Sequence, residues 1–328
     1  VFNLTAVLIQ AGVAAFIVSD RCKTFIGSRF ARCVLALLYM VLPNAWEVHG
    51  NLTNSQWHLA LLVCLIVVTA EPVSKGARFV DLALTTISAV SGPFCVLLFP
   101  ISFVIAWRDR TRHKILMLII ISVGCVVQAF ALLTTTREVQ SVLGASVELF
   151  FQIIGRHLVI GPLLGVRGFS KLESMGLWNW FTATTLTIVS LVSTTYLLRR
   201  VSNELRLVIA FALLITVTAL AWPAVTLEQG QWTAIANNVT AQRYWFVPCF
   251  VFYAGLLFVI ANVRSKVEKA IAVGLLVISS YGVVVDYKIP PLKDFDFQTH
   301  AAEFERAEPG TTVSIPINPD WKMQLKKK

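Results

Sequence analysis

Long apolar runs alternate with short polar segments along the whole chain. Six of these runs span about 17 to 20 residues with at most one charge, long enough for an α-helix to cross a hydrocarbon core of about 30 Å. They are Val1 to Val18, Lys114 to Leu133, Leu177 to Leu197, Leu205 to Trp222, Tyr244 to Ala261 and Ala270 to Val285. The pattern predicts an integral membrane protein with many helices.

The composition agrees with this interpretation. Hydrophobic residues make up 56% of the chain and charged residues 14%, whereas soluble domains are about one quarter charged. A formal charge of +10 would suggest nucleic acid in a soluble protein, but basic loops in a membrane protein set its orientation, so we expect no nucleic-acid partner. The six cysteines form no CxxC pair, and we interpret them as small buried apolar side chains.

The first apolar run begins at Val1 and has neither a basic n-region nor a small-residue cleavage site. A secretory signal peptide would carry both. We therefore interpret Val1 to Val18 as a spanning helix of a chain truncated upstream.

Basic residues cluster in short loops between the apolar runs, and the positive-inside rule places such loops in the cytoplasm. The clusters are Arg21, Lys23, Arg29 and Arg32; Lys75 and Arg78; Arg108, Arg110, Arg112 and Lys114; Arg199, Arg200 and Arg206; and Arg264, Lys266 and Lys269.

This assignment constrains two segments. Residues 79 to 107 start and end inside, which predicts a helical hairpin broken at Ser91, Gly92 and Pro93. Residues 147 to 165 start and end outside, which predicts a re-entrant or interfacial segment rather than a full crossing. Such a segment needs protein or a watery cavity beside it, so we expect a cavity on the outer side.

Because successive crossings alternate between the two sides, the same assignment places residues 42 to 61, residues 222 to 243 and everything after residue 285 outside. We therefore divide the chain into a transmembrane domain, residues 1 to 285, and an extracytoplasmic tail, residues 286 to 328. The tail contains paired prolines and a β-like run, TTVSIPI. About 40 residues seldom build a core of their own, so we expect a small ordered appendage.

The stretch LPNAWEVHGNLTNSQWHLAL, residues 42 to 61, holds an unusual number of polar side chains. Glu47 is its only carboxylate and a candidate catalytic base. Its neighbours can all form hydrogen bonds with hydroxyl groups, which suits a sugar or sugar phosphate: His49, Asn51, Asn54 and Gln56. In the alternative interpretation, Asn51 or Asn54 caps the next helix and Trp46 and Trp57 belong to an interfacial aromatic belt.

Two further pairs are candidate substrate-binding residues. Arg156 and His157 interrupt an apolar segment, where an unpaired cation is costly; a phosphate ligand would explain them, and so would an ion pair with Glu148. Arg243 and Tyr244 open another apolar run, where the arginine can grip a phosphate. A snorkelling arginine beside an aromatic belt explains that pair equally well.

The chain resembles bacterial polytopic membrane proteins of surface-polysaccharide synthesis, which are similar to the GT-C class of glycosyltransferases. The similar stretches cover nearly the whole chain: LPNAWEVHGNLTNSQWHLAL, the break SGPFCVLLFP, the helix start RYWFVP, and the tail SIPINPDWKMQL following VDYKIPPLKDFDF. The resemblance implies an all-α, GT-C-like bundle of roughly 8 to 11 transmembrane or re-entrant helices. It also implies a multi-pass protein of the bacterial inner membrane with its active face outside.

The resemblance further implies transfer of a sugar from a polyprenyl-phosphate donor to a glycan or lipid acceptor. Enzymes of this class use an acidic residue of the first outer loop as base. We expect that loop upstream of Val1, so in this chain the choice falls on Glu47. Arg243 and Arg156 would stabilise the departing phosphate, and a groove formed partly by the hairpin at Gly92 and Pro93 would hold the prenyl chain.

The sequence gives no support for a cofactor. A divalent metal is possible in this class, but His49 and His58 have no third ligand spaced to join them. A transporter or flippase for a lipid-linked or soluble glycan is the main alternative, since broken apolar segments also occur at transporter sites. Only three polar residues, Asp81, Gln128 and Arg156, are candidates for a deep transport site. A polysaccharide polymerase or a non-catalytic assembly protein is a third possibility.

Overall fold

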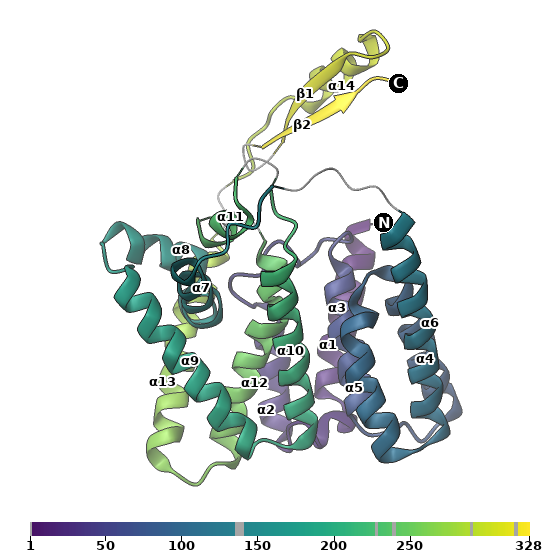
Figure 1. The fold of residues 1–328 in the computed structure, drawn as a ribbon, viewed down its shortest axis with the longest axis vertical. Coiled ribbons are helices and arrows are strands. Elements are labelled where there is room, and N and C mark those ends of the chain that lie inside the picture. Colours follow the sequence, from purple (N-terminus) through teal and green to yellow (C-terminus); the bar gives the residue numbers. More distant parts are fainter. Residues whose placement is uncertain (1, 135–140, 227–228, 238–240, 289–290, 318–320) are drawn as a thin grey trace. The chain divides into compact units, whose positions relative to one another are not determined.

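The computed structural model describes residues 2–134, 141–226, 229–237, 241–288, 291–317 and 321–328 (Figure 1). The chain forms two compact units, Val1–Tyr287 and Lys288–Lys328. The larger unit is helical throughout its regular structure, and the smaller unit combines one helix with a two-stranded sheet.

Short polar turns separate the helices of the larger unit. These helices are α1 (Phe2–Val18), α2 (Arg29–Met40), α3 (Ser55–Val68), α4 (Lys75–Ser91), α5 (Phe94–Asp109), α6 (Arg112–Thr134), α7 (Val147–Ile154), α8 (Gly161–Ser174), α9 (Trp180–Arg200), α10 (Asn203–Ala221), α11 (Gln231–Asn237), α12 (Phe246–Asn262) and α13 (Lys266–Asp286). Three short helices of other types lie between them: the 3₁₀-helices η1 (Asp20–Lys23) and η3 (Gln242–Trp245), and the π-helix η2 (Gly155–Ile160).

Within the described residues, six helical segments are long and apolar enough to cross a membrane: Arg112–Thr134, Val147–Ser174, Trp180–Arg200, Asn203–Ala221, Gln242–Asn262 and Lys266–Asp286. Five of them fall on apolar runs identified in the sequence, which confirms those helices. The run at Val1 to Val18 forms the slightly shorter helix α1.

Helix α3 lies at the centre of the larger unit. Thirteen of its 14 residues are buried, as expected for a helix that is apolar on every face. At its end the ammonium group of Lys114, on α6, donates hydrogen bonds to the carbonyls of Ile66, Val67 and Thr69 at 2.7 to 3.0 Å. These carbonyls have no partner within the helix, so Lys114 both satisfies them and fixes α6 beside α3.

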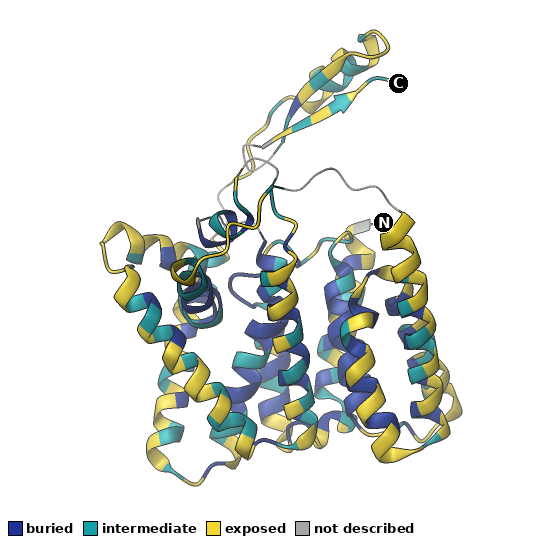
Figure 2. Ribbon diagram, viewed as in Figure 1, coloured by how far each residue is buried: buried dark blue, intermediate teal, exposed yellow. Residues whose placement is uncertain are grey.

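Helices α6, α9 and α13 expose apolar side chains along much of their length (Figure 2). Such surfaces suit a lipid environment rather than water. Where α6 meets α4, a Cβ on Gly124 would lie 2.7 Å from the Cβ of Ala89. Small residues therefore allow the two backbones to approach closely, as is common between membrane helices.

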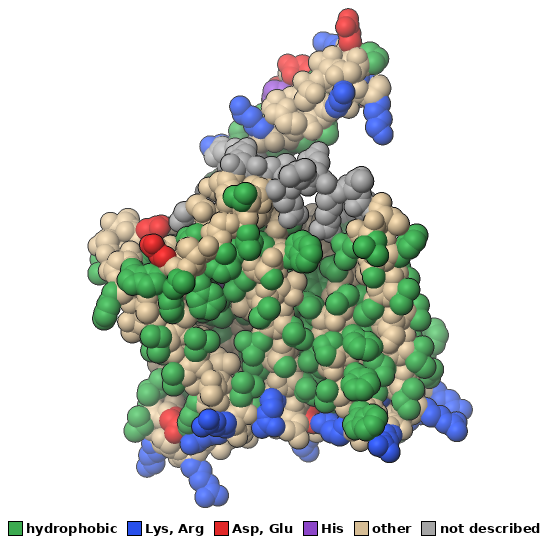
Figure 3. All heavy atoms as spheres, in the orientation of Figure 1, with side chains coloured by type: hydrophobic (Ala, Val, Ile, Leu, Met, Phe, Trp, Pro, Cys, Tyr) green, Lys and Arg blue, Asp and Glu red, His purple; other side chains and the backbone are tan. Residues whose placement is uncertain are grey.

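The basic loops lie along one edge of the larger unit, where Lys and Arg side chains gather (Figure 3). We call this the basic edge. Residues 41–54, 222–226 and 241–243 lie at the other end of the same helices, the non-basic edge (Figure 1). The predicted hairpin is also present: α4 ends at Ser91, Gly92 and Pro93 form the break, and α5 begins at Phe94.

Residues 147 to 174 form a bent helical segment, α7, η2 and α8. A π-helical turn occupies residues 155–160, and Gly165 interrupts α8 with φ 69° and ψ −175°. Figure 1 shows the segment beginning and ending near the non-basic edge, as the re-entrant or interfacial interpretation predicts. Its length alone would allow a crossing, but the kink at Gly165 turns the chain back.

The smaller unit contains α14 (Phe297–Arg306), β1 (Thr312–Ile317) and β2 (Trp321–Lys326). The strands pair antiparallel, with Thr312 opposite Lys326 and Ile317 opposite Trp321. Strand β1 coincides with the β-like run TTVSIPI of the sequence.

Candidate functional site

Glu47 and Arg243 form an ion pair at the non-basic edge. The guanidinium of Arg243 donates to Oε1 of Glu47, and its backbone N–H donates to Oε2 at 3.3 Å. The second guanidinium nitrogen, Nη2, donates to the carbonyl of Ala224 at 2.9 Å. The two side chains are 19% and 26% exposed, so the pair remains accessible from outside the protein.

Local backbone geometry places Arg243 here. Ala241 adopts φ 69° and ψ 15°, a left-handed conformation that is uncommon for residues other than glycine. This turn directs the chain into η3 and α12. Arg243 therefore begins a helix whose start is fixed, rather than lying on a free loop.

Asn51 and Asn54 support the loop that carries Glu47. Both side-chain amides donate to the backbone carbonyl of Glu47, at 3.2 and 2.9 Å. The oxygen of Asn51 accepts the N–H of Thr53 at 3.0 Å. Asn54 occupies the N-cap position of α3 but makes no side-chain capping bond. The two residues thus orient Glu47, and the proposed capping role is not seen.

A surface pocket of about 440 Å³ lies beside the same loop. It is lined by Asn3, Gly50, Asn51, Leu52 and Thr53. Its polar side chains can form hydrogen bonds with hydroxyl groups, as the sequence predicted for this stretch.

His49 lies in a chain of ring and amide contacts behind the loop. The amide nitrogen of Gln10 donates to its Nδ1 at 2.7 Å, and its ring stacks on that of His58 with centroids 5.5 Å apart. The hydroxyl of Tyr39 in turn donates to Nδ1 of His58 at 2.5 Å. Burial, and to a smaller extent the neighbouring His58, lowers the pKa of His49 to about 3. His49 is therefore neutral at physiological pH.

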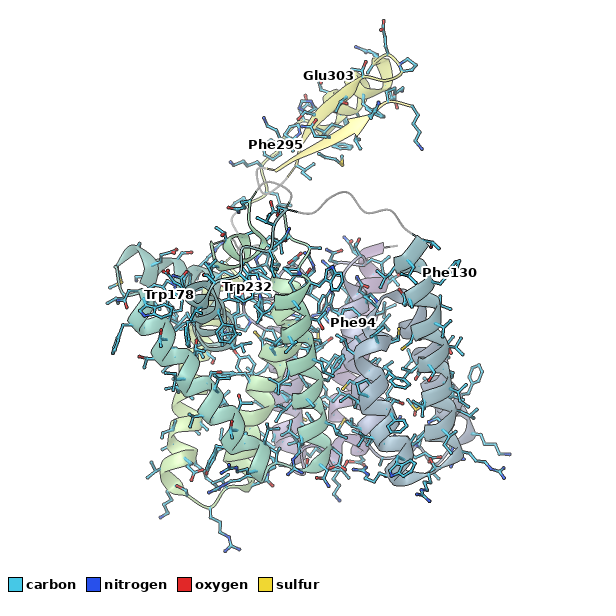
Figure 4. All side chains as sticks on the ribbon, viewed as in Figure 1. Phe94, Phe130, Trp178, Trp232, Phe295 and Glu303 are labelled. Atoms are coloured by element: carbon cyan, nitrogen blue, oxygen red, sulfur yellow. The ribbon has the colours of Figure 1, made fainter. Side chains whose placement is uncertain are left out.

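Tyr244 also lies near the ion pair, whereas Gln56 lies against the break between α4 and α5. The guanidinium of Arg243 is 4.9 Å from the centre of the Tyr244 ring, and the Tyr244 hydroxyl accepts the N–H of Ala224 at 3.1 Å. The amide oxygen of Gln56 lies so close to Gly92 that a Cβ there would be 2.1 Å away. The next residue, Trp57, packs edge-on against Phe94, with ring centroids 4.5 Å apart. Phe94 is labelled in Figure 4.

Arg156 and His157 form contacts within the chain. The Arg156 guanidinium donates to the carbonyl of Ala236 and lies 4.0 Å from the centre of the Phe169 ring. In the described part of the chain no carboxylate lies within ion-pair distance of it, and Glu148 accepts a hydrogen bond from Gln152 instead. His157 donates from Nε2 to the carbonyl of Ile235 at 3.1 Å.

These contacts fasten the bent segment to α11. His157 also stacks on Trp245 with centroids 4.6 Å apart and planes 6° apart. Both Arg156 and His157 are buried. The structure therefore gives them a connecting role, separate from the Glu47–Arg243 pair, and leaves phosphate binding by them a prediction.

Asp286 is a site residue that the sequence analysis missed. Its carboxylate accepts the backbone N–H groups of Asn44, Val166 and Arg167 at 2.8 to 3.2 Å. It thereby joins the end of α13, the kink of α8 and the loop of Glu47. A signal was present: a carboxylate at a helix C-terminus opposes the helix dipole and needs a compensating partner.

Buried polar atoms without a hydrogen-bond partner concentrate near the ion pair. Of six such atoms in the described chain, five belong to the segments that carry Glu47 and Arg243: Nε2 of His49, Nε1 of Trp57, both amide atoms of Gln242 and Nε1 of Trp245. Gln242 and Trp245 are completely buried. Unpaired buried polar groups are rare in proteins, and a catalytic or binding role is one of the explanations for them. Gln242 and Trp245 are further residues that the sequence did not single out.

A large apolar cavity lies elsewhere in the larger unit. It measures about 720 Å³ and lies between α9 on one side and α10, α12 and α13 on the other. The bent segment contributes Leu158, Val159 and Leu163. No residue of α4 or α5 lines this cavity, so the expectation that Gly92 and Pro93 help form a groove for the prenyl chain stays a prediction.

The polar residues considered for a transport site do not form one. Asp81 is 2% exposed, but its partners come from the basic edge: Arg21 at 2.7 Å through both oxygens and His113 at 3.1 Å. Gln128 is half-buried and donates to the carbonyl of Val90 at 3.2 Å. Within the described residues, no three His, Cys, Asp or Glu side chains are grouped to hold a metal ion.

No protein-family model, curated protein or solved structure matches the chain. Function is therefore argued from the geometry of the ion pair and from the resemblance noted in the sequence.

Proposed function

We propose that the chain is a membrane glycosyltransferase that moves a sugar from a polyprenyl-phosphate donor to a glycan or lipid acceptor. The observation that supports this proposal is the Glu47–Arg243 pair. It joins a carboxylate and a guanidinium from loops 196 residues apart at the non-basic edge, which the positive-inside rule makes extracytoplasmic. Sugar transfer from a lipid phosphate needs both groups, one for a proton and one for a phosphate.

In the proposed reaction, an acceptor hydroxyl oxygen forms a bond to the anomeric carbon of the donor sugar. The bond between that carbon and the phosphate oxygen breaks, and the phosphate leaves with the electron pair. The carboxylate of Glu47 takes the proton of the hydroxyl as general base. Arg243 stabilises the negative charge that develops on the leaving phosphate.

The ion pair itself gives a reason for ordered binding. Without donor, the guanidinium of Arg243 is held by the Glu47 carboxylate. A donor phosphate competes for the forked donors of Arg243 and so releases the carboxylate when the substrate is present. Asn51 and Asn54 are positioning residues in this scheme, because their amides fix the backbone of Glu47.

The proposal is tested by incubating the purified full chain with a panel of polyprenyl-phosphate sugars and candidate acceptors, and measuring products by mass spectrometry. We expect product with wild type and its loss in Glu47→Gln and Arg243→Ala. Glu148→Gln is the matched control, since Glu148 is another carboxylate outside the pair. Movement of glycan across vesicles without any new glycosidic bond would instead indicate a transporter.

A further inference from the structure

The large apolar cavity lies between helices that stand apart. Helix α9 packs mainly against α7 and η2, and the cavity separates it from α10, α12 and α13. Its volume of about 720 Å³ is within the range of ligand sites, roughly 300 to 1,000 Å³. The lining is mostly aliphatic and aromatic, with scattered hydroxyl groups and Glu268 at one end, so it suits a hydrocarbon chain better than a polar molecule.

The two ends of the cavity differ in polarity. Towards the non-basic edge it is lined by Leu158, Val159, Leu163 and Pro248, which offer a charged group no partner. Towards the basic edge it reaches Tyr196 and Glu268. There the Tyr196 hydroxyl donates to the Glu268 carboxylate, and Arg200 lies 3.8 Å from the same carboxylate.

Cations surround this second end. The turns after α9 and α12 contribute the cations Arg199, Arg200, Arg264, Lys266 and Lys269 and the two carboxylates Glu204 and Glu268. Glu204 lies 3.7 Å from the guanidinium of Arg108 on α5. Glu268 is already engaged by Tyr196 and Arg200. In the described structure Arg199, Lys266 and Lys269 have no acidic partner within ion-pair distance, so the net field at this end attracts an anion.

We propose that the cavity binds an anionic phospholipid from the leaflet at the basic edge. One acyl chain fills the space between α9 and α12, and the phosphate headgroup lies among the cations of the two turns. A polyprenyl-phosphate donor fits less well, because its phosphate at the non-basic edge would meet the apolar end of the cavity. The site is separate from the proposed sugar-transfer site and does not depend on it.

The purified full chain is equilibrated with phosphatidylglycerol or phosphatidylcholine of identical acyl chains, and retained lipid is counted by native mass spectrometry. We expect wild type to retain phosphatidylglycerol about fivefold or more over phosphatidylcholine. The double change Lys266→Gln and Lys269→Gln removes this preference. The matched control, Lys23→Gln with Lys75→Gln, also removes two basic-edge cations but leaves the cavity untouched.

A second measurement, photocrosslinking, can be made on the wild-type protein alone. Phosphatidylglycerol with a photoreactive acyl chain should crosslink wild type within residues 186–197 or 251–259, and excess unlabelled phosphatidylglycerol should compete. Ala272→Phe, which fills the cavity, should abolish this crosslink in monodisperse protein. Crosslinks confined to the exposed faces of α6 and α13, or stronger retention of polyprenyl phosphate than of phosphatidylglycerol, would overturn the proposal.

Discussion

The carboxylate of Glu47 receives both the guanidinium and the backbone N–H of Arg243. The first contact depends on the arginine side chain, and the second does not. Replacing Arg243 therefore removes the charge at this position but leaves one hydrogen bond to Glu47 in place. Replacing Glu47 removes both.

This difference predicts unequal losses of stability. We expect Glu47→Ala to lower the free energy of unfolding by about 1 to 3 kcal/mol and Arg243→Ala by less, since hydrogen bonds to charged groups contribute about that much. A double-mutant cycle in detergent should show positive coupling between them. The exposed pair Arg108–Asp109 is the control, with a coupling below about 1 kcal/mol. Equal coupling in both pairs would contradict a fixed Glu47–Arg243 geometry.

Gly165 holds the kink that lets Asp286 reach the bent segment. Its φ of 69° and ψ of −175° lie in a region open almost only to glycine, and a Cβ would be 2.4 Å from the Asp286 carboxylate. We expect Gly165→Ala to destabilise the protein by at least about 1 to 3 kcal/mol, measured by thermal unfolding. Gly274→Ala on α13, with open space around it, should be neutral or slightly stabilising.

Gln242 places two unpaired amide atoms in a fully buried position. An apolar side chain of similar shape removes that penalty, which is about 1 to 3 kcal/mol for an unsatisfied buried group. Gln242→Met should therefore leave the melting temperature unchanged or raise it. If the amide instead serves the substrate, product formation in the same variant should fall. A strongly destabilised Gln242→Met protein would show that the amide has a structural partner.

His49 makes stability depend on pH. Its pKa is about 3 in the folded protein against 6.5 for a free side chain. Between these values the unfolded chain binds a proton that the folded chain excludes, so the free energy of unfolding falls as the pH drops from 6.5 towards 3. The slope from this group is at most about 1.4 kcal/mol per pH unit. The free energy of unfolding of His49→Gln should change less with pH over this range than that of wild type, measured by unfolding titrations at several pH values.

Hydropathy and charge were sufficient to predict the long apolar helices α6, α9, α10, α12 and α13 and the α4–α5 hairpin, but they did not single out α2 or α3 as helices. Apolar runs long enough to span a membrane are visible in the sequence. The break at Gly92 and Pro93 was predicted because glycine and proline interrupt helices. The same reasoning brought Glu47 and Arg243 to one edge. It could not predict that they touch, because the lateral order of membrane helices depends on contacts between distant residues.

The residues missed by the sequence analysis illustrate this limit. Asp286 acts by joining three segments that lie more than 100 residues apart, and Gln242 is notable only because it is buried without a partner. The position of the cavity could not be predicted either. The charged loops indicate on which side of the membrane each helix ends, but not which helices are separated by a cavity. The sequence pattern therefore predicted at which edge the site lies, whereas the residues that make up the site depend on tertiary packing.

The measurement that tests the proposed sugar transfer most directly is the single-turnover rate of Glu47→Gln with saturating lipid-linked donor. Loss of a general base should slow product formation by about 10² to 10⁴-fold, while donor binding, which depends on Arg243, is retained or strengthened. A Glu47→Gln rate equal to that of wild type would contradict the assignment of the Glu47–Arg243 pair as the catalytic site.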